Sequence, residues 1–139
     1  METMYITHPK CRLHEMGSWH PESPQRLDAI SDQLLTNGLM PDLNDQYAQQ
    51  ASDDDILRVH TSEYLAYLRE HVPKQGYYPI DPDTLMSPHT LDAALYAAGA
   101  SLAGVDAVMT GSAKTVFCAV RPPGHHTCRT RAMGVLLPE

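Results

Sequence analysis

The sequence predicts an α/β fold in which helices flank a parallel sheet. An unbroken apolar run at 115–120, Thr-Val-Phe-Cys-Ala-Val, is typical of a strand buried on both faces of such a sheet. A shorter β-prone run, Met-Tyr-Ile-Thr, occupies 4–7. Between these two runs, apolar periodicity and capping residues indicate several helices. The 139 residues suffice for one domain and not for two, so we assign 1–139 to a single unit.

The composition argues against several classes of function. Seventeen acidic and ten basic side chains leave a formal net charge of −7, which argues against direct binding to a nucleic acid backbone. No apolar run approaches the roughly 18–20 residues of a membrane span, and the N-terminus lacks the basic-then-apolar start of a secretory signal. The three cysteines are widely spaced without a CxxC pair, which favours reduced thiols and a cytoplasmic protein.

After a loop predicted for 8–22, the first helix is expected to begin at Ser23-Pro24. Ser23 is the expected N-cap, and Pro24 is the expected first helical residue. One apolar stripe follows at the spacing i, i+3, i+7, i+8, formed by Leu27, Ile30, Leu34 and Leu35. Asn37-Gly38 then ends the helix.

Two shorter helices are predicted next. Ser52 is followed by three aspartates, the pattern of an N-cap and an acidic first turn. The same aspartates would suit a cation site, but the helix start accounts for them without a ligand. Thr61 is the expected cap of a further helix over 62–71.

The stretch 74–87 is predicted to be a long connection, because it contains prolines, a glycine and two tyrosines. Loops of this length are often functional. Ser87-Pro88 opens a long helix that runs to about Thr110 and ends at Gly111. Its interior is rich in alanine and glycine, which predicts that the helix packs closely on a sheet.

The segment Arg-Pro-Pro-Gly-His-His at 121–126 directly follows the predicted buried strand. Ligands in open α/β sheets bind at the carboxyl ends of the strands, so this segment is a candidate site. Its two prolines and glycine predict a rigid turn. Adjacent side chains on a regular strand point to opposite faces, and only an irregular turn can direct His125 and His126 to one pocket. Without this context, a histidine pair is most often a surface or structural feature.

Three ordered segments resemble the histone deacetylase superfamily, which groups zinc-dependent deacetylases, bacterial acetylpolyamine amidohydrolases and acetoin-utilisation-type proteins. The run Ala-Val-Arg-Pro-Pro-Gly-His-His at 119–126 is similar to the family's tandem-histidine segment, in the form of its class II and bacterial branches. The run at 20–27 resembles the HPExPxRL segment, and the run at 60–65 resembles HTxxYL. The resemblance covers residues 4 to about 134 and implies part of an arginase/deacetylase-type parallel sheet with flanking helices.

The resemblance also implies a reaction and its residues. In this family a zinc ion polarises the acetyl carbonyl and its bound water, and hydrolysis acts on acetyl-lysine, an acetylpolyamine or a similar acyl-amide. His126 matches the general base and acid, and His125 matches the neighbour that assists it. Arg26 matches an arginine near the cavity for the acetate product. Gly134 and Val135 match the lining of the acyl-lysine tunnel, although the family usually carries an aromatic residue in place of Val135.

The family's metal ligands are two aspartates and a histidine, and these positions and the family's transition-state tyrosine have no counterpart here. The sequence therefore predicts no metal site in this chain. His8, His14 and His20 are evenly spaced but lack the Cys or acidic pattern typical of zinc. A Cys–His nucleophile at Cys128 would lack a third group to orient it.

Three hypotheses remain open at this point. In the first, the chain is the N-terminal part of a deacetylase or amidohydrolase and is inactive by itself. In the second, it is a non-catalytic remnant or binding module that hides the edges of an incomplete sheet, through self-association or a partner. In the third, the unfamiliar tail at 135–139 marks a truncated or frameshifted gene.

Overall fold

The computed structural model describes residues 3–132. In chain order the elements are β1 (Thr3–Thr7), the 3-10 helix η1 (Pro9–Arg12), α1 (Gln25–Thr36), the 3-10 helix η2 (Met40–Asp42), β2 (Leu43–Tyr47), α2 (Asp53–Leu57), α3 (Ser62–Glu70), β3 (Tyr78–Asp81), β4 (Thr84–Met86), α4 (Thr90–Met109) and β5 (Thr115–Cys118). Both predicted strands and all four predicted helices are present.

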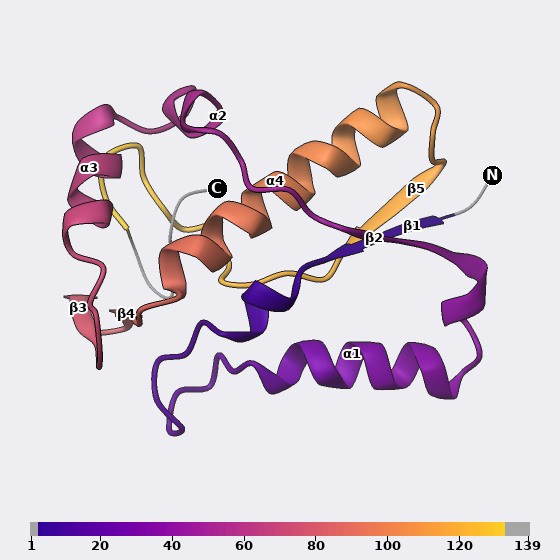
Figure 1. Ribbon diagram of the computed structural model, residues 1–139, viewed down its shortest axis with the longest axis horizontal. Coiled ribbons are helices and arrows are strands. Elements are labelled where there is room, and N and C mark those ends of the chain that lie inside the picture. The colour runs from indigo at the N-terminus through magenta and orange to yellow at the C-terminus, as the bar shows by residue number, and fades with distance from the viewer. Residues whose placement is uncertain (1–2, 133–139) are drawn as a thin grey trace.

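Three parallel strands form the main sheet, in the order β2-β1-β5. Helix α1 covers one face, where Leu27 belongs to the same buried cluster as Tyr5 of β1. Helix α4 covers the other face, where Ala100 clusters with Ile6. Figure 1 shows the sheet between the two helices. Because successive side chains of β1 point to opposite faces, Tyr5 and Ile6 hold the two helices on opposite sides, and the predicted α/β layering follows.

The small residues of α4 allow it to lie close to its neighbours. A Cβ atom added at Gly104 would lie 3.0 Å from Cγ1 of Val116 on β5, and one added at Gly99 would lie 1.8 Å from the carbonyl oxygen of Gln49. The close packing predicted from the Ala- and Gly-rich sequence is therefore confirmed. By length and composition α4 would also be able to cross a membrane, a test that the core helices of folded domains also pass.

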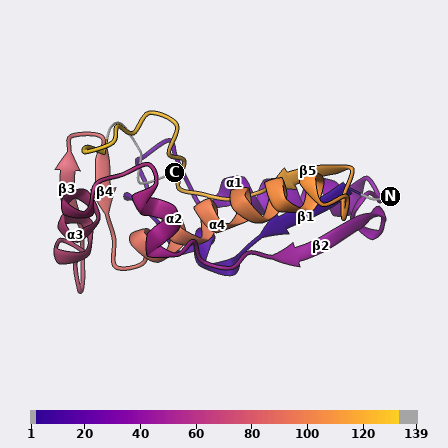
Figure 2. The ribbon, with the colours of Figure 1, turned by 90° about the horizontal axis from the view of Figure 1, so that it is seen from above.

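A second core lies beside the main sheet, where α2, α3 and the β3–β4 hairpin pack around the first half of α4. Its most buried side chains include Ile56 of α2, Leu68 of α3 and Met86 of β4. Figure 2 shows α3 and the hairpin at the end of the molecule away from the sheet. Helix α4 contributes to both cores, so it joins the sheet to this helical end.

The stretch 74–87 is not the open connection that the sequence predicts. There β3 and β4 form an antiparallel hairpin, with Tyr78 opposite Met86 and an irregular register between Pro79 and Asp81. Proline cannot donate to a ladder of hydrogen bonds, so it is tolerated only at edges and irregularities of a sheet. In a two-stranded hairpin both strands are edges, which is why Pro79 is accommodated.

Both Ser-Pro helix starts lie further along the chain than predicted. Helix α1 begins at Gln25, with Pro24 at the N-cap position and no capping side chain. Helix α4 begins at Thr90 rather than at Pro88. There the Thr90 hydroxyl oxygen accepts a 2.7 Å hydrogen bond from the backbone N–H of Ser87. The Ser-Pro pair therefore forms the turn before the helix and not its first turn.

Strand β5 is not buried on both faces, contrary to the expectation from its apolar sequence. Within residues 3–132 it pairs only with β1, so its other edge has no partner strand there. Phe117 remains 47% exposed, although its ring stacks on Tyr5 with 6.0 Å between centroids. An apolar run predicts burial only if another layer is present to cover it, and the described residues supply no such layer beyond β5.

Candidate functional site

The tandem histidines lie in a tight turn shortly after β5. The backbone N–H and the hydroxyl of Thr127 both donate to the carbonyl oxygen of Gly124, at 2.9 and 2.7 Å. His125 and His126 therefore occupy the two central positions of a four-residue turn. Both side chains are exposed, and their ring centroids are 4.4 Å apart with 54° between the ring planes. The turn thus brings together two adjacent rings that a regular strand would separate.

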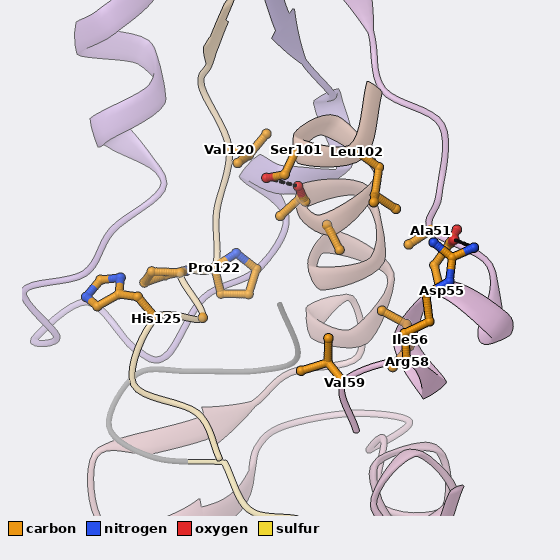
Figure 3. A pocket seen from close by; sticks show the side chains of 14 residues that line it. Ala51, Asp55, Ile56, Arg58, Val59, Ser101, Leu102, Val120, Pro122 and His125 are labelled. Carbon is orange, nitrogen blue, oxygen red and sulfur yellow. Dashed lines mark hydrogen bonds and ion pairs between the residues drawn. The ribbon is translucent and has the colours of Figure 1, made fainter. Parts of the chain in front are cut away.

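A cavity of about 530 Å³ opens beside this turn, bounded by α2, the middle of α4 and the segment after β5. Figure 3 shows Pro122 and His125 on one side of it, with Ile56 and Val59 on the other. Most of the lining residues are apolar, as in many small-molecule sites. His125 borders the cavity and His126 does not, and the His125 ring extends away from the cavity, beyond Pro122 (Figure 3).

The backbone that leads into the turn is anchored by Arg121, which is 0% exposed. Its Nε and Nη2 atoms donate to the two carboxylate oxygens of Glu22, at 2.9 and 2.5 Å. Its Nη1 atom donates to the backbone carbonyl of Cys11 at 2.9 Å and to that of His14. A single guanidinium therefore joins the start of the histidine segment to two segments near the N-terminus.

His14 lies against this ion pair as a neutral imidazole. Its Nδ1 atom is 2.7 Å from the Thr90 hydroxyl oxygen, while its Nε2 atom is buried without a hydrogen-bond partner in the described structure. Burial, reinforced by the positive charge of Arg121, lowers the pKa of His14 to about 3. The 3.8 Å contact between His14 Nε2 and a Glu22 carboxylate oxygen is therefore not an ion pair at neutral pH.

Arg26 also reaches the end of β5. Its Nη2 atom donates to the carbonyl oxygen of Val120 at 2.6 Å, while most of the side chain is exposed. The structure therefore places Arg26 next to the segment that carries the histidines. Gly134 and Val135, the two positions expected to line a substrate tunnel, lie outside the described residues.

The side chains of residues 3–132 include no cluster of three or more His, Cys, Asp or Glu suited to a metal ion. Two other motif histidines make structural contacts. His20 Nδ1 accepts a 3.1 Å hydrogen bond from the Glu22 N–H, and His60 Nδ1 lies 3.3 Å from the carbonyl oxygen of Arg129. The described residues therefore do not provide enough ligands to bind the metal ion that the family resemblance implies.

Sequence reasoning singled out the histidines but missed the buried pair of Glu22 and Arg121. Both residues lie inside the segments that carry the family resemblance, which was the available signal. Their pairing was not predictable from spacing, because 99 positions separate them in the chain.

A family model described as "Histone deacetylase domain" matches residues 20–135 of the chain. The match includes both histidines of the turn, Glu22 and Arg121. The chain belongs to the histone deacetylase family. Membership confirms the fold expected from the three motifs, and it suggests a metal cofactor for the family activity.

Known relatives of this histone deacetylase chain agree with that assignment. A "Probable deacetylase" of Archaeoglobus fulgidus is 35% identical over 128 residues, covering 91% of this chain and 35% of the relative. The human "Polyamine deacetylase HDAC10" is 36% identical over 131 residues, covering 91% of this chain and 18% of the relative. The crystal structure of the HDA15 HD domain superposes with a TM-score of 0.89 at 31% identity, covering 99% of this chain and 40% of that one.

The chain thus spans well under half the length of each of these relatives. The relatives are named as deacetylases, which supports a hydrolase of the deacetylase class for the family to which this chain belongs.

Proposed function

We propose that this chain supplies the acid/base histidines of a deacetylase or amidohydrolase that hydrolyses an acyl-amide bond. The observation that carries the proposal is the turn that holds His125 and His126 after β5, in a chain of the histone deacetylase family. Two exposed imidazoles 4.4 Å apart can act on the same substrate. Imidazole suits both proton acceptance and proton donation, because it exchanges protons near neutral pH.

In the proposed reaction His126 accepts a proton from the attacking water, whose oxygen bonds to the acyl carbon. His126 then donates this proton to the amine nitrogen as the C–N bond breaks, which leaves acetic acid and a free amine. The acid then gives its proton to the amine, and the final products are acetate and an ammonium. His125 donates a hydrogen bond that stabilises the negative charge developing on oxygen. Arg26, beside Val120, is a candidate for holding the acetate.

The substrate we propose is an acetylated amine, either an acetyl-lysine or an acetylpolyamine. The name of the human relative, a polyamine deacetylase, supports this class. The net charge of −7 attracts cationic molecules weakly over long range, as with an acetylpolyamine, whose unacetylated amines stay protonated; an acetyl-lysine side chain is neutral, so the charge does not select between the two. Zinc is the metal we propose for the whole protein, with ligands from outside residues 3–132, because the described residues hold no suitable cluster. The isolated chain is then expected to be inactive.

The decisive experiment transfers the histidine turn into a complete domain. Residues 3–132 would replace the matching 40% of the HDA15 HD domain, and hydrolysis of an acetyl-lysine peptide and an acetylpolyamine would be measured. We expect turnover that falls by about 10²- to 10⁴-fold in His126→Ala. His89→Ala removes an exposed histidine outside the turn and serves as the matched control.

Two results would contradict the proposal. One is a folded, active chimera whose rate is unchanged by His126→Ala. The other is turnover by the isolated 139-residue chain that His126→Ala abolishes, because the chain would then complete its own catalytic site.

A second candidate function, a non-catalytic binding module, is favoured by the unpaired edge of β5. Within residues 3–132 this edge has no partner strand, and Phe117 beside it is 47% exposed. Unpaired edges readily bind other chains. As a binding module, the chain is expected to self-associate through this edge, and an experiment that tests this is described in the Discussion.

A further inference from the structure

Arg121 is the most deeply buried charged side chain near the histidine turn, and the reaction proposed above does not use it. Its guanidinium donates to four oxygen atoms, the two of the Glu22 carboxylate and the carbonyls of Cys11 and His14. These acceptors belong to two separate stretches of the N-terminal region. A planar guanidinium with a rigid fork of donors can satisfy this arrangement, whereas the single nitrogen of a lysine cannot.

The segments that Arg121 contacts are themselves fixed to the two helices that enclose the sheet. The Cys11 thiol donates to the carbonyl oxygen of Ala93 on α4 at 3.8 Å, and the His14 ring contacts Thr90 at the start of the same helix. Glu22 lies three residues before α1. Through these contacts, the Arg121 side chain fixes the position of the chain after β5 relative to both α1 and α4.

Little rotational freedom remains between Arg121 and the two histidines. The intervening residues are Pro122, Pro123 and Gly124. Proline rings fix φ, so the first two residues hold the chain direction that Arg121 sets. The carbonyl of Gly124 is held in turn by the two hydrogen bonds from Thr127. An orientation imposed at Arg121 is therefore transmitted to the turn.

A purely stabilising role does not account for this arrangement. A buried ion pair contributes little net stability, since desolvation of both charges offsets their attraction, and apolar residues of similar volume often serve as well. An apolar pair would not make the directional hydrogen bonds that Arg121 makes to the Glu22 carboxylate and to the Cys11 and His14 carbonyls.

We propose that Arg121 is the positioning residue of the tandem-histidine turn, held by Glu22 and the Cys11 and His14 carbonyls so that the two imidazoles keep their mutual placement. This inference rests on the proposed acid/base role of His125 and His126 for its functional meaning. Its structural content is independent of that role, and the test reads the geometry directly rather than the activity.

The experiment uses nuclear magnetic resonance on the full 139-residue chain. In the wild type, ring protons of His125 and His126 are expected to show a cross-relaxation peak, because the centroids are 4.4 Å apart. In Arg121→Lys we expect this peak to be lost and the ring signals of both histidines to shift or broaden. The peak between His71 and Tyr67, whose centroids are 4.1 Å apart at the far end of the molecule, should persist.

Two further variants separate positioning from folding. The double variant Glu22→Leu/Arg121→Met removes both charges together, so that no unpaired charge is left buried. We expect it to fold, with the His71–Tyr67 peak intact, and to lose the His125–His126 peak. Arg12→Lys alters an exposed ion pair with Asp28, at 2.8 Å, and should leave all of these signals unchanged.

A folded Arg121→Lys or double variant that keeps the wild-type histidine peak and shifts would overturn the inference. Failure of the chimera to hydrolyse acetyl-amides would contradict the proposed function but would leave this geometric result intact. The two proposals therefore fail through different measurements.

Discussion

Buried polar side chains, more than the exposed histidines, determine the geometry of the site at the scale of single residues. Arg121 is 0% exposed and would be strongly destabilising without Glu22, because a buried charge needs a partner and hydrogen bonds. His14 avoids the same cost by remaining neutral. One charged pair and one neutral imidazole thus occupy the space between the N-terminal loop and the end of β5.

His14 should make the stability of the chain depend on pH. In the unfolded chain its pKa is near 6.5, and in the folded chain it is about 3, so the unfolded state binds more protons between these values. The contribution of neutral His14 to the free energy of unfolding is fully present above pH 6.5 and is lost as the pH falls from 6.5 toward 3. Urea unfolding of the wild type and of His14→Gln between pH 7.5 and 5 measures it.

The wild type is expected to lose stability more steeply than His14→Gln over this range, by at most about 1.4 kcal/mol per pH unit. The exposed His89, changed to Gln, is the control and should follow the wild type. Equal slopes in the wild type and His14→Gln would show that His14 is not held neutral by the fold.

Gly99 of α4 packs so closely against the backbone of residues 49–51 that there is no room for a Cβ atom. A methyl group there would lie 1.8 Å from the Gln49 carbonyl oxygen and 2.9 Å from the Ala51 backbone nitrogen. We expect Gly99→Ala to lower the free energy of unfolding by about 1–3 kcal/mol despite the better helix propensity of alanine. Chemical unfolding measures the change. Ser101→Ala, at an exposed position of the same helix, should be neutral or slightly stabilising.

At the scale of secondary-structure elements, the sequence correctly predicted those features that depend only on neighbouring residues, such as helix caps. Ser52 caps α2 and Thr61 caps α3, as predicted. A capping side chain needs only the next few backbone N–H groups, so the signal is complete within the sequence. The hairpin of β3 and β4 escaped prediction because its strands are stabilised by each other and by packing on the second core.

The Ser52 cap offers a direct test at this scale. The Ser52 hydroxyl accepts a 3.1 Å hydrogen bond from the Asp55 N–H, and the Asp55 carboxylate accepts one from the Ser52 N–H at 3.1 Å. We expect Ser52→Ala to cost about 1 kcal/mol in the free energy of unfolding. Ser62→Ala, at an exposed position that caps no helix, is the matched control. Equal stability of both variants would mean that the α2 cap contributes nothing.

At the scale of the whole molecule, α1 and α4 cover the two faces of the sheet at β1, and within residues 3–132 the outer edge of β5 has no partner strand. On the α4 side of this edge, Val105, Val108 and Met109 lie beside Val116 and Cys118 of β5 and are between 44% and 79% exposed. On the opposite side, Phe117 stacks on Tyr5 and is 47% exposed. An exposed apolar surface next to an unpaired strand edge favours association with another chain. The relatives are longer proteins, of which this chain covers 35% in the archaeal deacetylase and 40% in the HDA15 structure.

The isolated chain is therefore expected to self-associate. Sedimentation velocity over a wide concentration range should show dimers or larger species at high concentration. Met109→Glu places a charge on the most exposed of these side chains (79%) and should shift the equilibrium toward monomer. Leu35→Glu, at a 60% exposed position on α1, is the control. A wild-type chain that stays monomeric and unfolds cooperatively would contradict self-association.

The sequence by itself determined the α/β class, the helices and their caps, and the family, because these depend on neighbours along the chain or on short ordered motifs. It also predicted that the histidine pair lies in a turn after a strand. Only the tertiary structure decided that Arg121 pairs with Glu22, that His14 is buried as a neutral ring, and that β5 is an edge strand among the described residues. The physical reason is that burial, pKa and pairing depend on groups brought together from distant positions, which no local pattern records.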